Sequence, residues 1–122
     1  MLHKTKIVGL TLLISALCMQ SAYSYSNFLI NDTNGEIEFI VKYLGESVLS
    51  CRPDSVKVGP RQSVNVPASA CCLKFIDCAK KIGGKVVTTR YLPKTQCASH
   101  LIKVTDRKDG TGIDVRPLNP AD

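Results

Sequence analysis

The sequence predicts an all-β fold, a small antiparallel β-sandwich of about seven or eight strands that is stapled by disulfides. Short runs rich in β-branched residues recur about every ten residues, and residues that favour turns separate them. After residue 24, no apolar pattern of helical period extends beyond one turn. Six cysteines in 122 residues are typical of a small extracellular domain held by disulfides.

The N-terminal segment 1–24 predicts a secretory signal that is cleaved on export. A short basic start precedes the apolar run Ile7–Met19, and Ala22 and Ser24 supply the small residues expected before a cut after Ser24. The apolar run is shorter than the roughly 20 residues that a membrane-spanning helix needs. We therefore expect a secreted protein, extracellular or periplasmic, with an uncleaved N-terminal anchor as the alternative.

The rest of the sequence predicts one sandwich domain, 25–116, followed by a short C-terminal tail, 117–122. No segment after the signal is apolar enough to predict a membrane span. The whole chain carries a net charge of +6, and loss of Lys4 and Lys6 with the signal leaves +4. This moderate positive charge permits attraction to anionic surfaces without requiring it.

The first two strands are predicted at Phe28–Thr33 and Glu36–Tyr43. Apolar residues alternate with mostly polar ones in the second run, which is the period of a half-buried strand. Asn34-Gly35 separates the runs, and Asn-Gly is the strongest short signal for a β-hairpin because both turn positions need a positive φ. The sequence therefore predicts that these two strands pair as a hairpin.

The middle of the chain predicts the strands Ser55–Val58, Ser63–Val66 and Cys71–Asp77. Gly59-Pro-Arg-Gln62 forms the turn between the first two. This Gly-Pro turn between two valine-rich strands resembles the immunoglobulin-like sandwiches of extracellular proteins in style. The resemblance covers only these few residues and implies a sandwich architecture without implying an activity.

Three further strands complete the prediction, at Lys85–Tyr91, His100–Thr105 and Gly112–Arg116. The segment 80–84 ends in Gly-Gly and predicts the turn before the first of these strands. Asp109-Gly110 predicts a hairpin turn between the last two strands. These elements bring the total to the seven or eight strands of a small sandwich.

Cysteine use follows from the predicted compartment. Cys18 leaves with the signal, and an odd number of cysteines remains to form disulfides in an oxidising environment. The remaining cysteines are Cys51, Cys71, Cys72, Cys78 and Cys97. Two disulfides and one leftover thiol are the simplest outcome, and a leftover thiol makes a covalent homodimer an open alternative.

The alternation of a strand suggests how the cysteines pair. Cys71, Leu73 and Phe75 share one face of the predicted strand, which we take as the core face, and Cys72 points to the other face. The sequence thus predicts a buried Cys51–Cys71 disulfide, a Cys78–Cys97 disulfide across a loop, and Cys72 as the free or intermolecular thiol.

No catalytic residue, metal ligand set or cofactor site is predicted. His100 is the one imidazole after the signal, and its neighbour Cys97 cannot act as a nucleophile while it is in a disulfide. No Cys-x-x-Cys pair indicates a zinc site, and the loop 106–114 lacks the residue order of an EF-hand. Glu36 and Glu38 are explained as outer-face residues of a strand, and Asn31-Asp-Thr33, a formal glycosylation acceptor, as a strand end.

Basic residues supply the predicted binding site. The densest stretch comprises Lys80, Lys81, Lys85, Arg90 and Lys94, with Lys103, Arg107 and Lys108 in a later hairpin. If the two hairpins are neighbours, these residues form one basic patch, although lysines on strand edges also serve simply to prevent aggregation.

The predicted function is that of a secreted, non-enzymatic binding module. Its basic face would recognise a protein partner or an anionic surface, such as a glycan, lipopolysaccharide or membrane headgroups. Nucleic acid is disfavoured because Tyr91 is the one aromatic residue within the basic stretch. The alternative is a small inhibitor or toxin-like effector that acts through an exposed loop, Ser47–Asp54.

Overall fold

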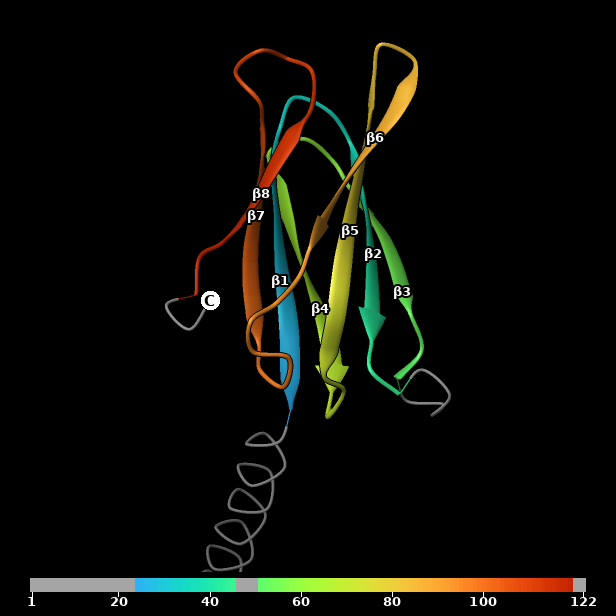
Figure 1. Cartoon of the computed structure of the whole chain (residues 1–122), viewed down its shortest axis with the longest axis vertical. Coiled ribbons are helices and arrows are strands. Elements are labelled where there is room, and N and C mark those ends of the chain that lie inside the picture. Colours follow the sequence, from blue (N-terminus) through green and yellow to red (C-terminus); the bar gives the residue numbers. More distant parts are fainter. Residues whose placement is uncertain (1–23, 46–50, 120–122) are drawn as a thin grey trace, which may run out of the picture.

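The computed structural model describes residues 24–45 and 51–119. Eight strands form two four-stranded sheets that pack face to face, which confirms the predicted all-β sandwich (Figure 1). The strands are β1 (Tyr25–Asp32), β2 (Ile37–Tyr43), β3 (Asp54–Val58), β4 (Gln62–Ser69), β5 (Leu73–Ile82), β6 (Lys85–Tyr91), β7 (His100–Asp106) and β8 (Ile113–Pro117).

The strand order is β4-β1-β7-β8 in one sheet and β3-β2-β5-β6 in the other. Every neighbouring pair is antiparallel except β1 and β7, which run parallel from the pairing of Asn27 with His100 onward. A parallel pair needs a long connection. Here every strand of the second sheet lies between β1 and β7 in the sequence. The prediction of an antiparallel sandwich therefore holds with one parallel exception.

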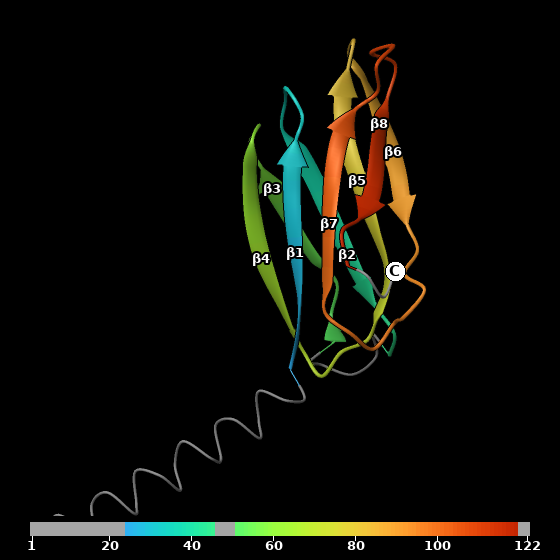
Figure 2. The ribbon, with the colours of Figure 1, turned by 90° about the vertical axis from the view of Figure 1, so that its left-hand side faces the viewer.

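The predicted hairpin around Asn34-Gly35 is wrong. β1 and β2 belong to different sheets, so this turn carries the chain across the sandwich and not between paired strands (Figure 2). Neither Asn34 nor Gly35 has the positive φ that a two-residue hairpin turn needs. The reason is the buried side chain of Asn31, which binds the carbonyl oxygens of Gly35 and Val58 at 2.8 and 2.9 Å and so fixes a corner between the sheets.

The two glycine-containing turns at the ends of β5 and β7 form true hairpins. Gly83 and Gly84, with φ of 58° and 79°, connect the antiparallel strands β5 and β6. Gly110, with φ of 74°, lies in the turn between β7 and β8, as Asp109-Gly110 predicts. Only glycine adopts such angles without steric cost, so the glycines in the sequence correctly predict the positions of these two turns.

The predicted orientation of β5 is wrong beyond Leu73, because a β-bulge reverses which side chains face the core. Phe75 lies opposite Lys42 whereas Leu73 lies opposite Tyr43, so one extra residue, Lys74, interrupts the alternation. Leu73, Ile76, Cys78 and Lys80 are buried, while Phe75 turns to the outer face. Phe75 instead packs beneath the Arg90 guanidinium, whose central carbon lies 3.7 Å from the ring centroid.

The bulge also explains the disulfides. Cys51–Cys71 forms as predicted, but the second disulfide joins Cys72 to Cys97 and not Cys78 to Cys97. Because the bulge turns Cys78 into the core, it is a buried free thiol, and Cys72 is not free. Burial raises the pKa of Cys78 to about 12. A covalent homodimer through Cys72 is therefore inconsistent with this pairing.

The C-terminal segment is attached to the sheet. Pro117, placed in the tail by the sequence, ends β8. The Leu118 N–H donates to the Leu101 carbonyl oxygen at 2.8 Å, and the Asn119 side chain bonds the backbone of Leu101 and Ser99 at 2.7 and 2.8 Å. Residues 117–119, which the sequence placed in the tail, are thus hydrogen-bonded to the sandwich.

Two features bear on the predicted compartment. Apart from Ser24, the predicted signal segment lies outside the described residues. Within the described residues, no helix is long and apolar enough to cross a membrane. Two disulfides are typical of extracellular or periplasmic proteins.

Candidate functional site

Charged residues gather around a hollow at the end of the sandwich that carries the β5–β6 and β7–β8 hairpins. The hollow has a volume of about 510 Å³, and we call it the end hollow. The turn between β1 and β2, the end of β5 and the β7–β8 hairpin surround it. Its lining residues are Asn34, Gly35, Lys80, Lys81, Ile82, Asp106, Arg107 and Gly110.

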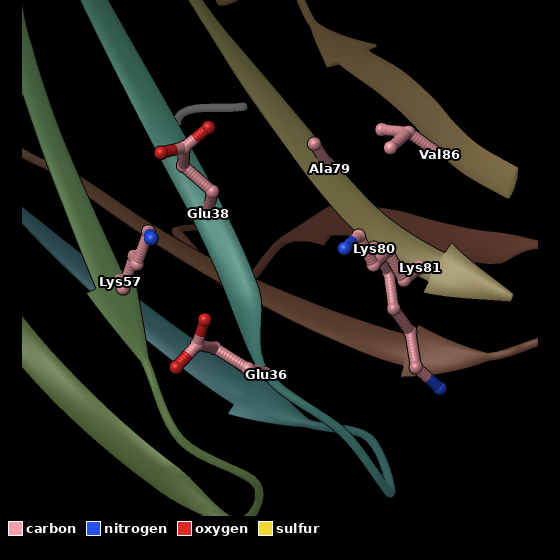
Figure 3. Close-up of a pocket in the computed structure, with 7 residues that line it drawn as sticks. All are labelled: Glu36, Glu38, Lys57, Ala79, Lys80, Lys81 and Val86. Atoms are coloured by element: carbon pink, nitrogen blue, oxygen red, sulfur yellow. The ribbon is translucent and has the colours of Figure 1, made fainter. Parts of the chain in front are cut away.

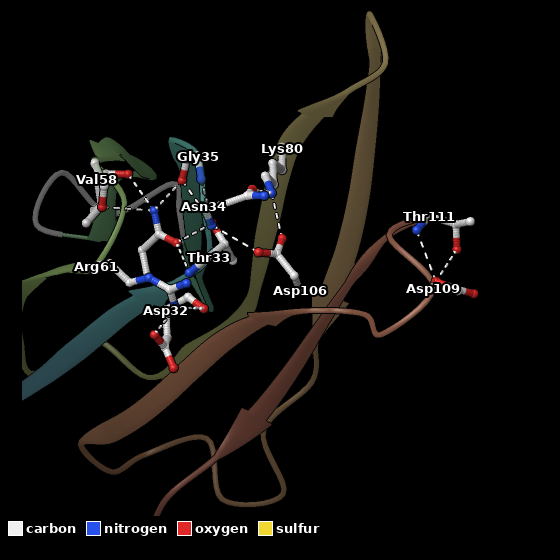
Figure 4. Close-up of polar contacts among 12 residues, drawn as sticks. Asp32, Thr33, Asn34, Gly35, Val58, Arg61, Lys80, Asp106, Asp109 and Thr111 are labelled. Atoms are coloured by element: carbon white, nitrogen blue, oxygen red, sulfur yellow. Dashed lines mark hydrogen bonds and ion pairs between the residues drawn. The ribbon is translucent and has the colours of Figure 1, made fainter.

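Lys80 is the buried charge of the end hollow, with 8% of its side chain exposed. Its ammonium group lies 2.5 Å from Asp106 Oδ1 and also donates to Asn34 Oδ1 (Figure 4). The Asn34 N–H donates to Asp106 Oδ2 at 3.0 Å. Because Lys80 and Asp106 come from different sheets, this cluster ties the two sheets together.

Asp106 is ionised under most conditions because its partners outweigh its burial. Burial raises the pKa of Asp106, but hydrogen bonds from the Lys80 ammonium and the Asn34 N–H lower it, and the net result is a pKa below the ordinary 3.8. The Lys80–Asp106 pair is therefore a fixed ion pair at neutral pH, and it keeps the Lys80 side chain in a defined position.

The remaining cations of the end hollow are exposed. Arg107 lies 3.2 Å from Asp114, but both side chains are more than half exposed, so water and salt weaken this pair. Lys81 makes no ion pair within the described residues. Lys85, at the start of β6, and Lys108, in the turn between β7 and β8, are exposed on the two hairpins but do not line the hollow. The fold thus brings together basic residues from two hairpins, as the sequence suggested for neighbouring hairpins.

A second hollow lies on the outer face of the β3-β2-β5-β6 sheet, with a volume of about 320 Å³ (Figure 3). We call it the face hollow. Ala79 lies opposite Glu38 in the ladder between β5 and β2, and its small side chain leaves space between its larger neighbours. The face hollow is lined by Glu36, Glu38, Lys57, Ala79, Lys80, Lys81 and Val86.

Three of the predicted basic residues do not contribute free charge to one patch. Lys80 is paired with Asp106, as described above. Arg90 forms a two-pronged salt bridge with Asp77, at 2.7 and 3.0 Å. Lys94 lies in the connection from β6 to β7, at the opposite end of the sandwich from the β5–β6 hairpin (Figure 1). Of the five residues, only Lys81 and Lys85 place an exposed cation at the hairpin end.

His100 and Cys97 have structural roles. His100 is 2% exposed, its Nε2 lies 2.7 Å from the Thr95 carbonyl oxygen, and its ring meets the edge of Tyr91 with centroids 6.1 Å apart. Cys97 is bonded to Cys72. A thiolate–imidazole pair therefore cannot form between these two residues in the oxidised protein.

The other sequence candidates also hold the fold together. Asn31 of the formal glycosylation site is fully buried, so its amide is inaccessible in the folded domain. In the loop 106–114, Asp109 Oδ1 accepts hydrogen bonds from Thr111 N and Oγ1 at 3.0 and 2.7 Å, as in a turn. No group of three potential metal ligands occurs within the described residues.

The alternative loop Ser47–Asp54 lies partly outside the described residues, which omit 46–50. Its described part begins at Cys51, which is bonded to Cys71. Sequence reasoning also missed that Glu36, Glu38 and Lys57 share a hollow with Lys81. The alternation of β2 places the two glutamates on one face, but the predicted β1–β2 hairpin assigned β2 the wrong neighbour.

Comparison with known proteins identifies the architecture alone. No family model and no curated protein matches the chain. One solved structure, described as "NMR structure of the protein from Eubacterium rectale", is similar with a TM-score of 0.58 at 13% identity. The match covers 82% of this chain and 94% of the other. The chain is thus a small β-sandwich domain with two disulfides.

Proposed function

We propose that this protein is a non-enzymatic binding module that acts outside the cytoplasm and receives an anionic group of its partner in the end hollow. One observation carries the proposal: Lys81 and Arg107 reach the same hollow from two separate hairpins, and the buried ammonium group of Lys80 lies in its wall. Cations held on a rigid scaffold bind an anion at a low entropic cost.

The scaffold supports this role in two ways. The Lys80–Asp106 pair and the glycine turns define the position of both hairpins. His100 and Cys97, the residues that a hydrolytic activity would most readily use, are engaged in the structure. The predicted signal segment and the two disulfides favour an extracellular or periplasmic location.

Retention on immobilised heparin, a sulfated polyanion, tests the proposal. We expect Lys81→Gln/Arg107→Gln to weaken retention by roughly tenfold in affinity, since two charge-assisted contacts are lost. The matched control is Arg52→Gln/Lys94→Gln, which makes the same charge change at the opposite end of the sandwich. An equal loss in both variants would show that only net charge matters, and it would overturn the proposal.

A further inference from the structure

A third hollow lies on the outer face of the β4-β1-β7-β8 sheet, and the proposed function does not use it. Its volume is about 410 Å³, a size that is ordinary for a ligand site. The hollow follows β1 between β4 and β7, in the sheet that faces the viewer in Figure 2. We call it the β1 hollow. Side chains from β1, from β7 and from the turn between β3 and β4 line it.

The floor of the β1 hollow is apolar, although the outer faces of such sandwiches are normally polar. β1 turns Phe28 and Ile30 outward, and Phe28 is 39% exposed. Leu118, 41% exposed, adds apolar surface to the same hollow. Ile30 lies opposite Ser63 of β4, whose small side chain leaves space beside it. An accessible aromatic ring therefore lies in a depression of the sheet.

Charged side chains form one end of the β1 hollow. Asp32, the last residue of β1, forms an ion pair with Arg61 (Figure 4), and its Oδ2 lies 3.4 Å from Lys103 Nζ. Arg61 Nη1 also donates to the Asp32 carbonyl oxygen at 3.1 Å. The Arg61 guanidinium lowers the pKa of Asp32 below its ordinary value of 3.8, so the carboxylate is ionised near neutral pH. This end therefore carries charges of both signs side by side.

Arg61 occupies its position at a conformational cost. It has a φ of 61° in the turn Gly59-Pro-Arg-Gln62, in which the Gln62 N–H donates to the Gly59 carbonyl oxygen at 3.3 Å. Glycine is the residue that suits this left-handed position after proline in a tight turn. Strained residues persist where their surroundings compensate, and they cluster at binding sites. The backbone of Arg61 is therefore a second indication of a binding site, beside the hollow itself.

The charged end keeps donors and acceptors for a ligand. An ionised carboxylate can accept about four hydrogen bonds, and Asp32 has contacts with Arg61 and Lys103. Within the described residues, the hydrogen bonds of Arg61 come from Nη1, so Nε and Nη2 can still donate. Gln62 is exposed at the same hollow and adds an amide donor and acceptor.

We propose that the β1 hollow binds a neutral saccharide, with the C–H face of a sugar ring on the Phe28 ring and sugar hydroxyl groups on Asp32 and Arg61. A hydroxyl group both donates and accepts, so it can bond a carboxylate and a guanidinium that lie side by side. The aromatic ring supplies a flat apolar contact for the C–H face. This inference goes beyond the proposed function, because it uses neither Lys81 nor Arg107.

Other classes of ligand match the β1 hollow less well. An anionic ligand would meet Asp32, and a cationic one would meet Arg61 and Lys103, in each case at a Coulombic cost. An acyl chain would cover the charged groups without bonding them. An extended peptide finds no open backbone on β1, because this strand is paired with both β4 and β7.

NMR titration of the isotope-labelled, disulfide-bonded protein with neutral oligosaccharides tests the proposal. Fragments of glucan, galactan, mannan and chitin are added in turn. We expect one of them to bind and to shift amide resonances within 28–32 and 61–63. Phe28→Leu should weaken this binding roughly tenfold, because it keeps the apolar bulk and removes the aromatic face. Arg61→Gly should do the same, and since glycine suits the left-handed backbone, that loss would not reflect a loss of fold.

Two control variants change similar side chains away from the β1 hollow. Val86→Ala removes an exposed apolar side chain from the other sheet, and Arg107→Gln removes a guanidinium from the end hollow. Both variants should bind the oligosaccharide as the wild type does. Circular dichroism of each variant shows whether its fold is intact.

The proposal would be overturned if none of the oligosaccharides shifts these resonances at roughly 10 mM, a concentration at which even a site of millimolar Kd is mostly occupied. Shifts that lie elsewhere on the domain would also overturn it, as would wild-type affinity of Phe28→Leu or of Arg61→Gly. Retention on heparin is a separate measurement, since it depends on Lys81 and Arg107 of the end hollow. The failure of one proposal therefore leaves the other standing.

Discussion

At the corner between the sheets, the side chain of Asn31 forms hydrogen bonds with backbone groups of the segments that meet there. Its Nδ2 lies within 3.0 Å of the carbonyl oxygens of Gly35, Val58 and Gly59, and its Oδ1 accepts from the N–H and hydroxyl of Thr33. Asparagine alone combines a double donor and an acceptor in this size. A single side chain therefore ties together the segments that meet where the chain crosses from one sheet to the other.

We predict that Asn31→Ala lowers the free energy of unfolding by about 3 kcal/mol, because several buried backbone groups lose their partners. Asn31→Asp should cost more than Asn31→Ala at neutral pH, since a carboxylate would face three carbonyl oxygens. Urea denaturation of the three proteins measures both differences. Equal stability of the Asp and Asn proteins would contradict this account of the corner.

At the scale of the strands, β5 shows how one inserted residue reassigns a face. The bulge at Lys74 leaves Leu73 in the core and moves Phe75 out of it, so that Ile76, Cys78 and Lys80 point inward. Burial of Lys80 costs folding free energy, because a buried ammonium group is stable only with a partner of opposite charge. Asp106 at the end of β7 supplies that partner from the other sheet.

We predict that Asp106→Asn destabilises the domain by about 2 kcal/mol near pH 7, because Lys80 loses its counter-charge. The pKa of Asp106 is lowered below 3.8 in the folded state, so the stabilising contribution of its charge is fully present above about pH 4 and is lost as the pH falls through the folded pKa. The difference between wild type and Asp106→Asn should therefore shrink in strong acid.

Urea denaturation near pH 7 and near pH 2.5 measures this change. Asp114→Asn is the control, since its exposed pair with Arg107 contributes little at either pH. A difference between wild type and Asp106→Asn that stays constant over this range would show that the ionised carboxylate is not what stabilises Lys80.

At the scale of the whole molecule, the disulfides crosslink the end of the sandwich opposite the end hollow. Cys71 and Cys72 are neighbours in the chain, and they bind Cys51 and Cys97 in two different connections. Such crosslinks typically stabilise a domain by about 2–4 kcal/mol each, a large share of the total for a domain of this size. The hairpin end, which carries the end hollow, depends instead on ion pairs and glycine turns.

We predict that the oxidised protein has two disulfides, no disulfide to a second copy, and one thiol, Cys78, that does not react in the folded state. Its burial and its pKa of about 12 leave almost no accessible thiolate at neutral pH. Intact mass under non-reducing conditions should show no adduct after alkylation of the native protein and one adduct after alkylation in denaturant. An adduct on the native protein, or a covalent dimer, would contradict the pairing described here.

Local chemistry in the sequence suffices to predict the strands, the glycine turns and one disulfide. The period of two along Ile37–Tyr43, the positive φ required at Gly83-Gly84 and at Gly110, and the core position of Cys71 depend on neighbours in the chain. The same is true of the basic stretch around Lys81. These properties are therefore visible without knowledge of the fold.

The tertiary structure alone decides which strands are neighbours, and with them which residues line the end hollow. The Asn34-Gly35 turn crosses between the sheets because Asn31 binds the backbone of a distant segment. The bulge in β5 exchanges Cys78 for Cys72 as the partner of Cys97. Sequence periodicity is insensitive to both, because a partner strand and an inserted residue depend on contacts between segments far apart in the chain. Lys81 and Arg107 meet at the end hollow for the same reason.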